Sequence, residues 1–304
     1  MKVAITGATG VIGRAAVTAL VSAGHEVSAL ARSEAKARLL AGMGAEPVRT
    51  TLAEADGLLR LVDGADAVCN FATAIPVGFA GALPGAWRKN DRLCIEGSLR
   101  VVEAARNAGV RRVVQESVSF LYADRGDAWV TEESSLDITT ATEPAAVAES
   151  HVQDYSCGSR TGVVLRFGLI VGEDPSTRWQ LRAARRGSPI GLGRPDGWLP
   201  TIHTDDLGPA VLAALTAPSG VYNVGAEPVL RSDYVAAFAQ AVGRAEVGFV
   251  GPVLRRLAGT RAEPLTRSLR VSAEHFTATT GWTPRRPAFG SAWLEPALAA
   301  VVAS

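Results

Sequence analysis

The sequence predicts an α/β fold, namely a Rossmann-type doubly wound parallel sheet with a smaller, interwoven C-terminal lobe. Short apolar runs alternate with helical stretches through the first two-thirds of the 304 residues, which is typical of parallel strands joined by right-handed helical crossovers. A glycine-rich turn, TGATGVIG, directly follows the first apolar run. After Gly172 the regularity weakens and Gly, Pro and Arg become frequent, as expected for a lobe with long loops.

The spacing of apolar residues gives the predicted elements in chain order. Runs rich in Val and Ile between turn residues are predicted to be strands, and runs with apolar side chains every three or four positions to be helices. The predicted strands are 2–6, 25–31, 47–50, 66–72, 111–117, 162–168 and 220–225. The predicted helices are 11–23, 33–43, 53–62, 88–108, 231–243 and 272–280.

Charge and composition exclude several classes of partner. The net charge is +1 and no uninterrupted apolar run reaches membrane-spanning length, so we expect neither nucleic acid nor a membrane as a partner. The chain enters a strand within two residues of its start, which leaves no room for a signal peptide, so a cytoplasmic location is expected. The cysteines and histidines form no CxxC or HxxxH pair, so no metal site is predicted.

The turn TGATGVIG lies between a strand and a helix, which is the context of a phosphate-binding loop. Its glycines allow a tight turn, close approach of the backbone to a pyrophosphate, and close packing of the helix on the strand. The phosphates would then bind the N–H groups at the positive end of the helix dipole. The alternative is a purely structural glycine turn. The predicted cofactor-binding residues here are Gly7, Thr9, Gly10, Val11, Ile12 and Gly13.

The spacing GxxGxxG in this turn is similar to that of extended or atypical short-chain dehydrogenases/reductases, of the NAD-dependent epimerase/dehydratase type. Further segments carry the same resemblance: GVRRVVQESVSFLYA (109–123), VVLRFGLIVG (163–172), IHTDDLGPAV (202–211), GVYNVG (220–225) and GWTP (281–284). The resemblance implies a nicotinamide dinucleotide cofactor. It places Thr51 and Leu52 near the adenine, Phe71, Ala72 and Thr73 near the ribose, and Phe167 and Gly168 near the nicotinamide.

The end of the second predicted strand favours NADP(H) over NAD(H). NAD enzymes place an acidic residue there to bind the ribose hydroxyls, whereas this chain has Ala31, Arg32 and Ser33, with Lys36 one turn later. An arginine fork suits a 2′-phosphate by charge and by shape; the alternative is a solvated surface charge. We therefore predict an NADP-binding domain at 1–172, rejoined by about 201–225, and a substrate-binding lobe formed by 173–200 and 226–304.

The catalytic serine, tyrosine and lysine that the resemblance implies are missing. Alignment with the family pattern puts Val118 at the serine position, and Ala141 and Ala145 at the tyrosine and lysine positions. Slippage of the alignment cannot restore the motif, because no lysine follows Lys89. The candidates left to orient a substrate are Ser117, Ser119, Tyr122, Trp198 and His203. The apolar segment 74–87 is predicted to be a lid, and Trp87, Trp179 and Trp198 could line a flat pocket.

These observations leave three hypotheses for the function. The first is an NADPH-dependent ketoreductase for an aromatic ketone, in which a phenol of the substrate itself supplies the proton. In lacking the triad, the chain resembles the angucyclinone ketoreductases of antibiotic biosynthesis, such as the ketoreductase of simocyclinone biosynthesis. The second is a catalytically inactive NADP(H)-binding sensor. The third, a nucleotide-sugar epimerase or dehydratase, is disfavoured because that chemistry needs the tyrosine. The identity of the ketone, the stereochemistry and the oligomeric state stay open.

Overall fold

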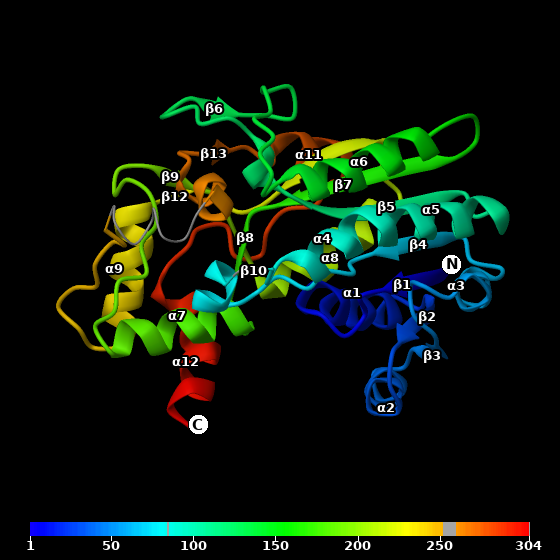
Figure 1. The fold of residues 1–304 in the computed structure, drawn as a ribbon, viewed down its shortest axis with the longest axis horizontal. Helices are drawn as coiled ribbons and strands as arrows, with labels where there is room; N and C mark the ends of the chain where they lie inside the picture. Colours follow the sequence, from blue (N-terminus) through cyan, green and yellow to red (C-terminus); the bar gives the residue numbers. More distant parts are fainter. Residues whose placement is uncertain (84, 252–259, 304) are drawn as a thin grey trace.

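A seven-stranded, entirely parallel sheet forms the centre of the computed structural model, which describes residues 1–83, 85–251 and 260–303 (Figure 1). The strands follow the order β11-β7-β5-β4-β1-β2-β3. Their bounds are β1 Lys2–Thr6, β2 Glu26–Ala31, β3 Glu46–Arg49, β4 Ala67–Asn70, β5 Arg112–Val118, β7 Thr161–Phe167 and β11 Gly220–Val224. The strand order reverses beside β1, and in doubly wound sheets this point is where a ligand binds.

Helices cover both faces of the sheet, so the predicted doubly wound α/β fold is confirmed. On one face lie α1 (Val11–Ser22), α2 (Glu34–Gly42), α8 (Thr204–Ala214) and α11 (Glu274–Thr280), whose apolar residues share one core with the sheet. On the other face lie α3 (Ala55–Val62), α5 (Ser98–Asn107) and α6 (Glu143–Tyr155). The strand interiors are mostly apolar because both faces are buried, and the exceptions include Gln115 and Ser117 of β5 and Arg166 of β7.

A second core lies beside the sheet and holds the C-terminal lobe. Helices α7 (Pro175–Arg185), α9 (Arg231–Ala241) and α12 (Glu295–Val302) pack together there (Figure 1). Short strands pair in twos around them: β6 (Trp129–Val130) with β13 (Arg270–Val271), β8 (Leu169–Val171) with β10 (Thr201–His203), and β9 (Trp198–Leu199) with β12 (Val229–Leu230). Residues 252–259 of the predicted lobe, and Pro84 of the predicted lid, lie outside the described residues.

Two predicted elements differ from the structure. The helix predicted at 88–108 consists of α4 (Arg88–Arg92), a π-helical turn (η2, Leu93–Gly97) and α5. Such π-turns occur mostly inside α-helices, and often at functional sites. The run 163–172 divides between β7 and β8, because Gly168 turns the chain away from the main sheet against Pro200. Within the described part of the chain, no helix is long and apolar enough to cross a membrane.

Candidate functional site

The glycine turn fits the close approach of a pyrophosphate. Gly7 has φ +66°, and a Cβ atom there would lie 2.1 Å from the carbonyl oxygen of Phe71. A Cβ atom at Gly13 would lie 2.2 Å from the carbonyl oxygen of Gly7. Gly10 is exposed and starts α1 without any side-chain cap. The first N–H groups of α1 therefore face outward from a bare backbone, as anion binding requires.

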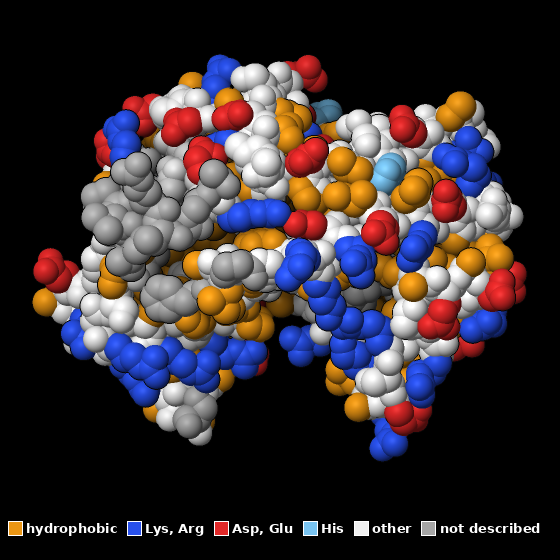
Figure 2. Space-filling model, in the orientation of Figure 1, with side chains coloured by type: hydrophobic (Ala, Val, Ile, Leu, Met, Phe, Trp, Pro, Cys, Tyr) orange, Lys and Arg blue, Asp and Glu red, His pale blue; other side chains and the backbone are white. Residues whose placement is uncertain are grey.

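Cationic side chains gather where β2 ends. Arg32 is exposed directly after Ala31, and Ser33 caps α2 by accepting a hydrogen bond from the backbone N–H of Lys36 (3.4 Å). Burial, followed by the like charges of Arg32 and Lys89, lowers the pKa of Lys36. No acidic side chain among the described residues pairs with these cations. Lys and Arg side chains are gathered between the α4 and α2 regions (Figure 2).

Lys89 is the member of this cationic cluster that sequence reasoning did not identify. It lies on α4, far along the chain from Arg32 and Lys36, so only the packing of α4 reveals it. A cluster of like charges without a counter-ion is costly in isolation and favours a bound anion. The charge and position of Arg32, Lys36 and Lys89 therefore suit a phosphate group.

The remaining predicted cofactor residues lie along the carboxyl edge of the sheet. Thr51 and Leu52 follow β3, and Leu52 packs near Gly97. Phe71 follows β4 and is buried, whereas Ala72 is half-buried and Thr73 is exposed. Phe167 ends β7, and the next residue, Gly168, donates its N–H to Val224 (3.1 Å). The structure thus aligns these segments along one edge, beside the glycine turn.

The three positions of the missing triad also lie at this edge. Val118 is the last residue of β5, Ala141 lies in the turn before α6, and Ala145 is in its first turn. The register of α6 is fixed by Glu149, which is buried and forms a two-point ion pair with Arg166 of β7 (2.9 and 2.6 Å). Ala145 precedes Glu149 by one helical turn, so the two lie on the same face of α6.

Four of the side chains proposed to orient a substrate are buried with other partners. Ser117 donates to the carboxylate of Glu149, and Ser119 donates to the carbonyl of Arg166 (3.1 Å). The Tyr122 hydroxyl donates to Asn223 (2.9 Å), and the Arg166 guanidinium lies 4.9 Å from the ring centre of Tyr122. Exposed fractions are 2% or less for Ser117, Ser119, Tyr122 and His203. These side chains support the framework and present no free surface.

His203 acts as a helix cap. Its Nδ1 accepts the backbone N–H of Asp205 (3.1 Å), and its ring meets Trp293 edge-on at 5.1 Å. The two aspartates that follow have other partners. Asp206 accepts the backbone N–H groups of Arg285 and Arg286, and Asp205 pairs with the Arg286 side chain.

The tryptophans divide into two groups. Trp87 donates its indole N–H to Gly81 (2.9 Å), and a Cβ atom at Gly78 would overlap the Trp179 ring, so both pack on the segment 74–87. Trp198 lies elsewhere, where it donates to Asp127 (3.0 Å) and stacks on Arg270. Ile75 and Leu83 of the segment are 51% and 64% exposed. The segment therefore presents apolar surface next to α4, as a flat apolar ligand would require.

Sequence reasoning missed a chain of charged groups around the triad positions. Arg261 forms an ion pair with Asp91 of α4 (2.6 Å) and donates to the carbonyl of Ala141 (3.5 Å). Desolvation, followed by the charges of Glu116 and Asp91, raises the pKa of Cys94 to about 12. Cys94 lies in the π-helical turn η2, between these two carboxylates. The chain of groups links β5, α4 and the turn before α6.

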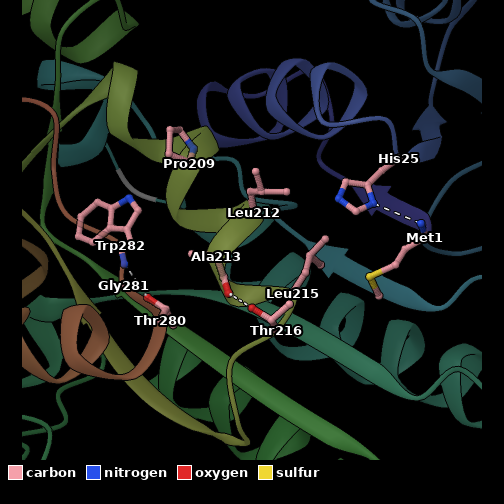
Figure 3. A pocket seen from close by; sticks show the side chains of 10 residues that line it. All are labelled: Met1, His25, Pro209, Leu212, Ala213, Leu215, Thr216, Thr280, Gly281 and Trp282. Carbon is pink, nitrogen blue, oxygen red and sulfur yellow. Dashed lines mark hydrogen bonds between the residues drawn. The ribbon is translucent and has the colours of Figure 1, made fainter.

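A groove lies away from this site, at the amino edge of the sheet (Figure 3). It has a volume of about 420 Å³ and lies between α8, Trp282 and the start of the chain, where Met1 and His25 precede β1 and β2. Because the glycine turn is at the opposite edge, this groove is separate from the candidate site. Among the described residues, no group of His, Cys, Asp or Glu side chains could hold a metal ion.

Relatives of known activity include two reductases. The 3-diazoavenalumate denitrifying reductase of a Streptomyces species is 29% identical over 309 residues, which covers 95% of this chain and 98% of that protein. A 4-hydroxy-2-methyl-3-oxo-4-farnesyl-3,4-dihydroquinoline-1-oxide ketoreductase from Stigmatella aurantiaca is 32% identical, over 57% of this chain and 52% of that protein.

Solved structures share the whole fold at low sequence identity. MoeE5 in complex with UDP-glucose and NAD superposes with a TM-score of 0.79 at 22% identity, covering 98% of both chains. Human SDR39U1 with NADPH gives a TM-score of 0.78 at 23% identity, covering 98% of this chain and 99% of that one. A family model matches residues 3–225. By this match, and by the glycine turn and sheet that it spans, the chain belongs to the NAD dependent epimerase/dehydratase family.

Proposed function

We propose that this protein is an NADPH-dependent reductase of an aromatic ketone of the polyketide type, as in antibiotic biosynthesis. One observation carries the proposal: the glycine turn leaves a bare helix start that suits a pyrophosphate, yet no lysine follows Lys89, and alignment predicts Ala141 and Ala145 near the positions of the tyrosine and lysine. An epimerase needs that tyrosine to remove a proton from a hydroxyl. A reductase does not need that tyrosine if its substrate can accept a hydride without a protein acid.

The cofactor assignment rests on fit. The bare glycine turn accommodates a pyrophosphate, and Arg32, Lys36 and Lys89 form a cationic cluster suited to the 2′-phosphate of NADP(H). Bound at this edge, the reduced nicotinamide would supply a hydride to the substrate. Solved proteins of this fold bind NAD in one case and NADPH in another, so the fold serves both cofactors.

The proton can come from the substrate in this proposal. A phenol beside the ketone forms an internal hydrogen bond that polarises the carbonyl, and its proton moves to the alkoxide oxygen as the C–H bond forms. General acid catalysis contributes about 10²–10⁴-fold, so a well-placed phenol can replace the tyrosine. The protein then orients a flat ligand and excludes water, for which segment 74–87 with Trp87 and Trp179 supplies apolar surface.

Methylation of the phenol tests this route. The wild-type protein should reduce a tetralone with a peri hydroxyl group in the presence of NADPH, and it should reduce the methyl ether far more slowly at similar affinity. Loss of the nicotinamide absorbance band measures the rate. An undiminished rate with the ether would disprove the substrate-assisted route. Tight NADPH binding without turnover of any ketone would favour the sensor hypothesis.

A second candidate reaction is the reduction of an aromatic diazo group. It is favoured by the full-length similarity to a denitrifying reductase of a diazo compound. A diazonium group is already cationic, so hydride addition to its terminal nitrogen gives a neutral aryl diazene, which then loses N₂ and leaves a C–H bond. No proton donor is required, which also agrees with Ala141 and Ala145. Release of N₂ from an aryl diazonium salt with NADPH would distinguish this reaction from ketone reduction.

A further inference from the structure

We propose that Glu116 is a catalytic acid of this protein, and that it donates a proton to the substrate phenolate that remains once the phenol has protonated the alkoxide. This inference rests on the proposed ketone reduction. Sequence comparison does not reveal the residue, because Glu116 lies two positions before Val118 and outside the triad positions. Its location in the structure makes it a candidate.

The first argument is position. Glu116 and Val118 are alternate residues of β5, so their side chains leave the same face of the strand, roughly 6.6 Å apart along it. Val118 is where the family's pattern places the serine that binds a substrate carbonyl. In the neighbouring strand β7, Leu165 and Phe167 pair in register with Glu116 and Val118, and Phe167 is a predicted nicotinamide neighbour. Glu116 therefore lies two residues before Val118, the position predicted to bind the substrate carbonyl, on the same face of β5.

The second argument is availability. The hydroxyls of Ser117 and Ser119 are already engaged. The Ser117 hydroxyl donates to the Glu149 carboxylate, and the Ser119 hydroxyl donates to the backbone carbonyl of Arg166. By contrast, no hydrogen bond or ion pair from another described residue reaches the Glu116 carboxyl, although its own backbone carbonyl accepts from Gln115. The residue as a whole is half-buried, whereas its carboxyl is desolvated. A carboxyl without a partner at this edge can bind a ligand.

The third argument is protonation. Desolvation raises the pKa of Glu116 to about 8, so the carboxyl carries its proton near neutral pH. Its register partner Leu165 is apolar, and the titratable group of another element whose charge is coupled to that of Glu116 is the Cys94 thiol of η2. A neutral carboxyl with a pKa near the working pH meets the requirement for a general acid.

The proton balance is simple. Hydride transfer turns the ketone into an alkoxide, and the neighbouring phenol protonates it and becomes a phenolate. The O–H bond of Glu116 then breaks as a new phenol O–H bond forms, which leaves a Glu116 carboxylate. Proton transfer from a group of pKa about 8 to a phenolate is downhill, because phenols titrate near ~10. Water returns the proton to Glu116 after the product leaves.

The experiment compares wild type with Glu116→Gln, Glu116→Asp and the control Glu133→Gln, which changes an exposed carboxyl. The substrates are the peri-hydroxytetralone and its methyl ether. We expect Glu116→Gln to lower kcat by about 10²–10⁴-fold and to abolish the decline of kcat above a pH of about 8. Glu116→Asp should retain part of kcat and the decline of kcat at high pH, and Glu133→Gln should match wild type. Affinity for NADPH, measured by calorimetry, should not change.

A readout without turnover accompanies the kinetics. Difference infrared spectra of the wild-type protein should show a protonated carboxyl band at neutral pH that titrates near 8 and is absent from Glu116→Gln. Wild-type kinetics in Glu116→Gln, or no such band, would overturn the role of Glu116 alone. A third outcome is that wild type reduces the methyl ether at full rate while Glu116→Gln reduces neither the ether nor the peri-hydroxytetralone. That result would exclude the phenol as proton donor and show that Glu116 protonates the alkoxide directly. Failure of wild type to reduce either ketone would refute both proposals.

Discussion

Arg32 is the side chain that we expect to decide between NADPH and NADH. It follows the buried end of β2 and is exposed, with no acidic partner among the described residues. A hydrogen bond to a charged group contributes about 1.5–3 kcal/mol. Arg32→Ala should therefore weaken NADPH binding by about 10- to 100-fold and leave NADH binding nearly unchanged, as measured by calorimetric titration of both cofactors.

The matched control is Arg38→Ala, because Arg38 is an exposed arginine on α2, the helix that follows Arg32, and it pairs with Glu34. It should leave both affinities unchanged. Lys89→Ala should weaken NADPH more than NADH as well, and it should raise the pKa of Lys36 by removing one of the like charges that lower it. Equal losses for both cofactors in Arg32→Ala would contradict the assignment of the cluster to a 2′-phosphate.

The start of α1 is the element on which anion binding depends. Gly7 and Gly13 tolerate no side chain, whereas a Cβ atom at Gly10 would meet only the Gly7 oxygen at 3.2 Å, and Gly10 has an ordinary φ of −75°. Gly10→Val should thus fold but place a branched side chain where the pyrophosphate needs bare N–H groups. We expect NADPH binding to be lost while circular dichroism and the unfolding midpoint stay close to wild type.

Gly42→Ala serves as the control for a glycine substitution at an open helical position, since no atom lies within 4 Å of a Cβ atom there. It should bind NADPH normally. Retention of NADPH affinity by Gly10→Val would show that TGATGVIG is only a structural turn in this chain.

Helix α6 depends on one buried ion pair for its register against the sheet. Glu149 and Arg166 side chains are 4% and 5% exposed, and removal of one partner of a buried pair costs about 3–5 kcal/mol because a charge stays unpaired. Glu149→Gln should lower the free energy of unfolding by that order, as measured by urea denaturation. Glu143→Gln, at the exposed start of the same helix, should change it little. Similar stabilities of the two variants would argue against this role for the pair.

At the scale of the whole molecule, Glu116 makes stability depend on pH. Its folded pKa of about 8 lies above the ordinary value of 4.5, so the folded state holds a proton that the unfolded state releases. Its contribution to stability is complete below about 4.5 and is lost as the pH rises through about 8. Between these values the wild type should lose up to about 1.4 kcal/mol per pH unit from this group.

Glu116→Gln removes that dependence, so its stability relative to wild type should increase as the pH rises. Urea denaturation of both proteins at several pH values measures the difference, with Glu133→Gln again as the control. A constant difference across this range would mean that the Glu116 carboxyl is already ionised in the folded protein.

The sequence by itself determined the sheet, the glycine turn and the absence of any YxxxK motif after Lys89. These features depend on local order: apolar runs predict strands, TGATGVIG between strand and helix predicts the phosphate turn, and no lysine follows Lys89. The family and the doubly wound fold were predictable for the same reason. The break of the 88–108 helix at a π-helical turn was not, because helical periodicity does not distinguish α from π geometry over so few residues.

Only the tertiary structure decided which polar side chains are available to a ligand. Ser117 and Glu116 are neighbours in the sequence, but strand alternation turns Ser117 onto the Glu149–Arg166 ion pair. The Glu116 carboxyl lies on the other face, where none of the described residues forms a hydrogen bond or ion pair with it. Lys89 joins Arg32 because the fold brings the charge of Lys89, on α4, within electrostatic range of Lys36 at the start of α2. Burial, partner and charge all depend on residues distant in sequence, and these contacts exist only once the chain has folded.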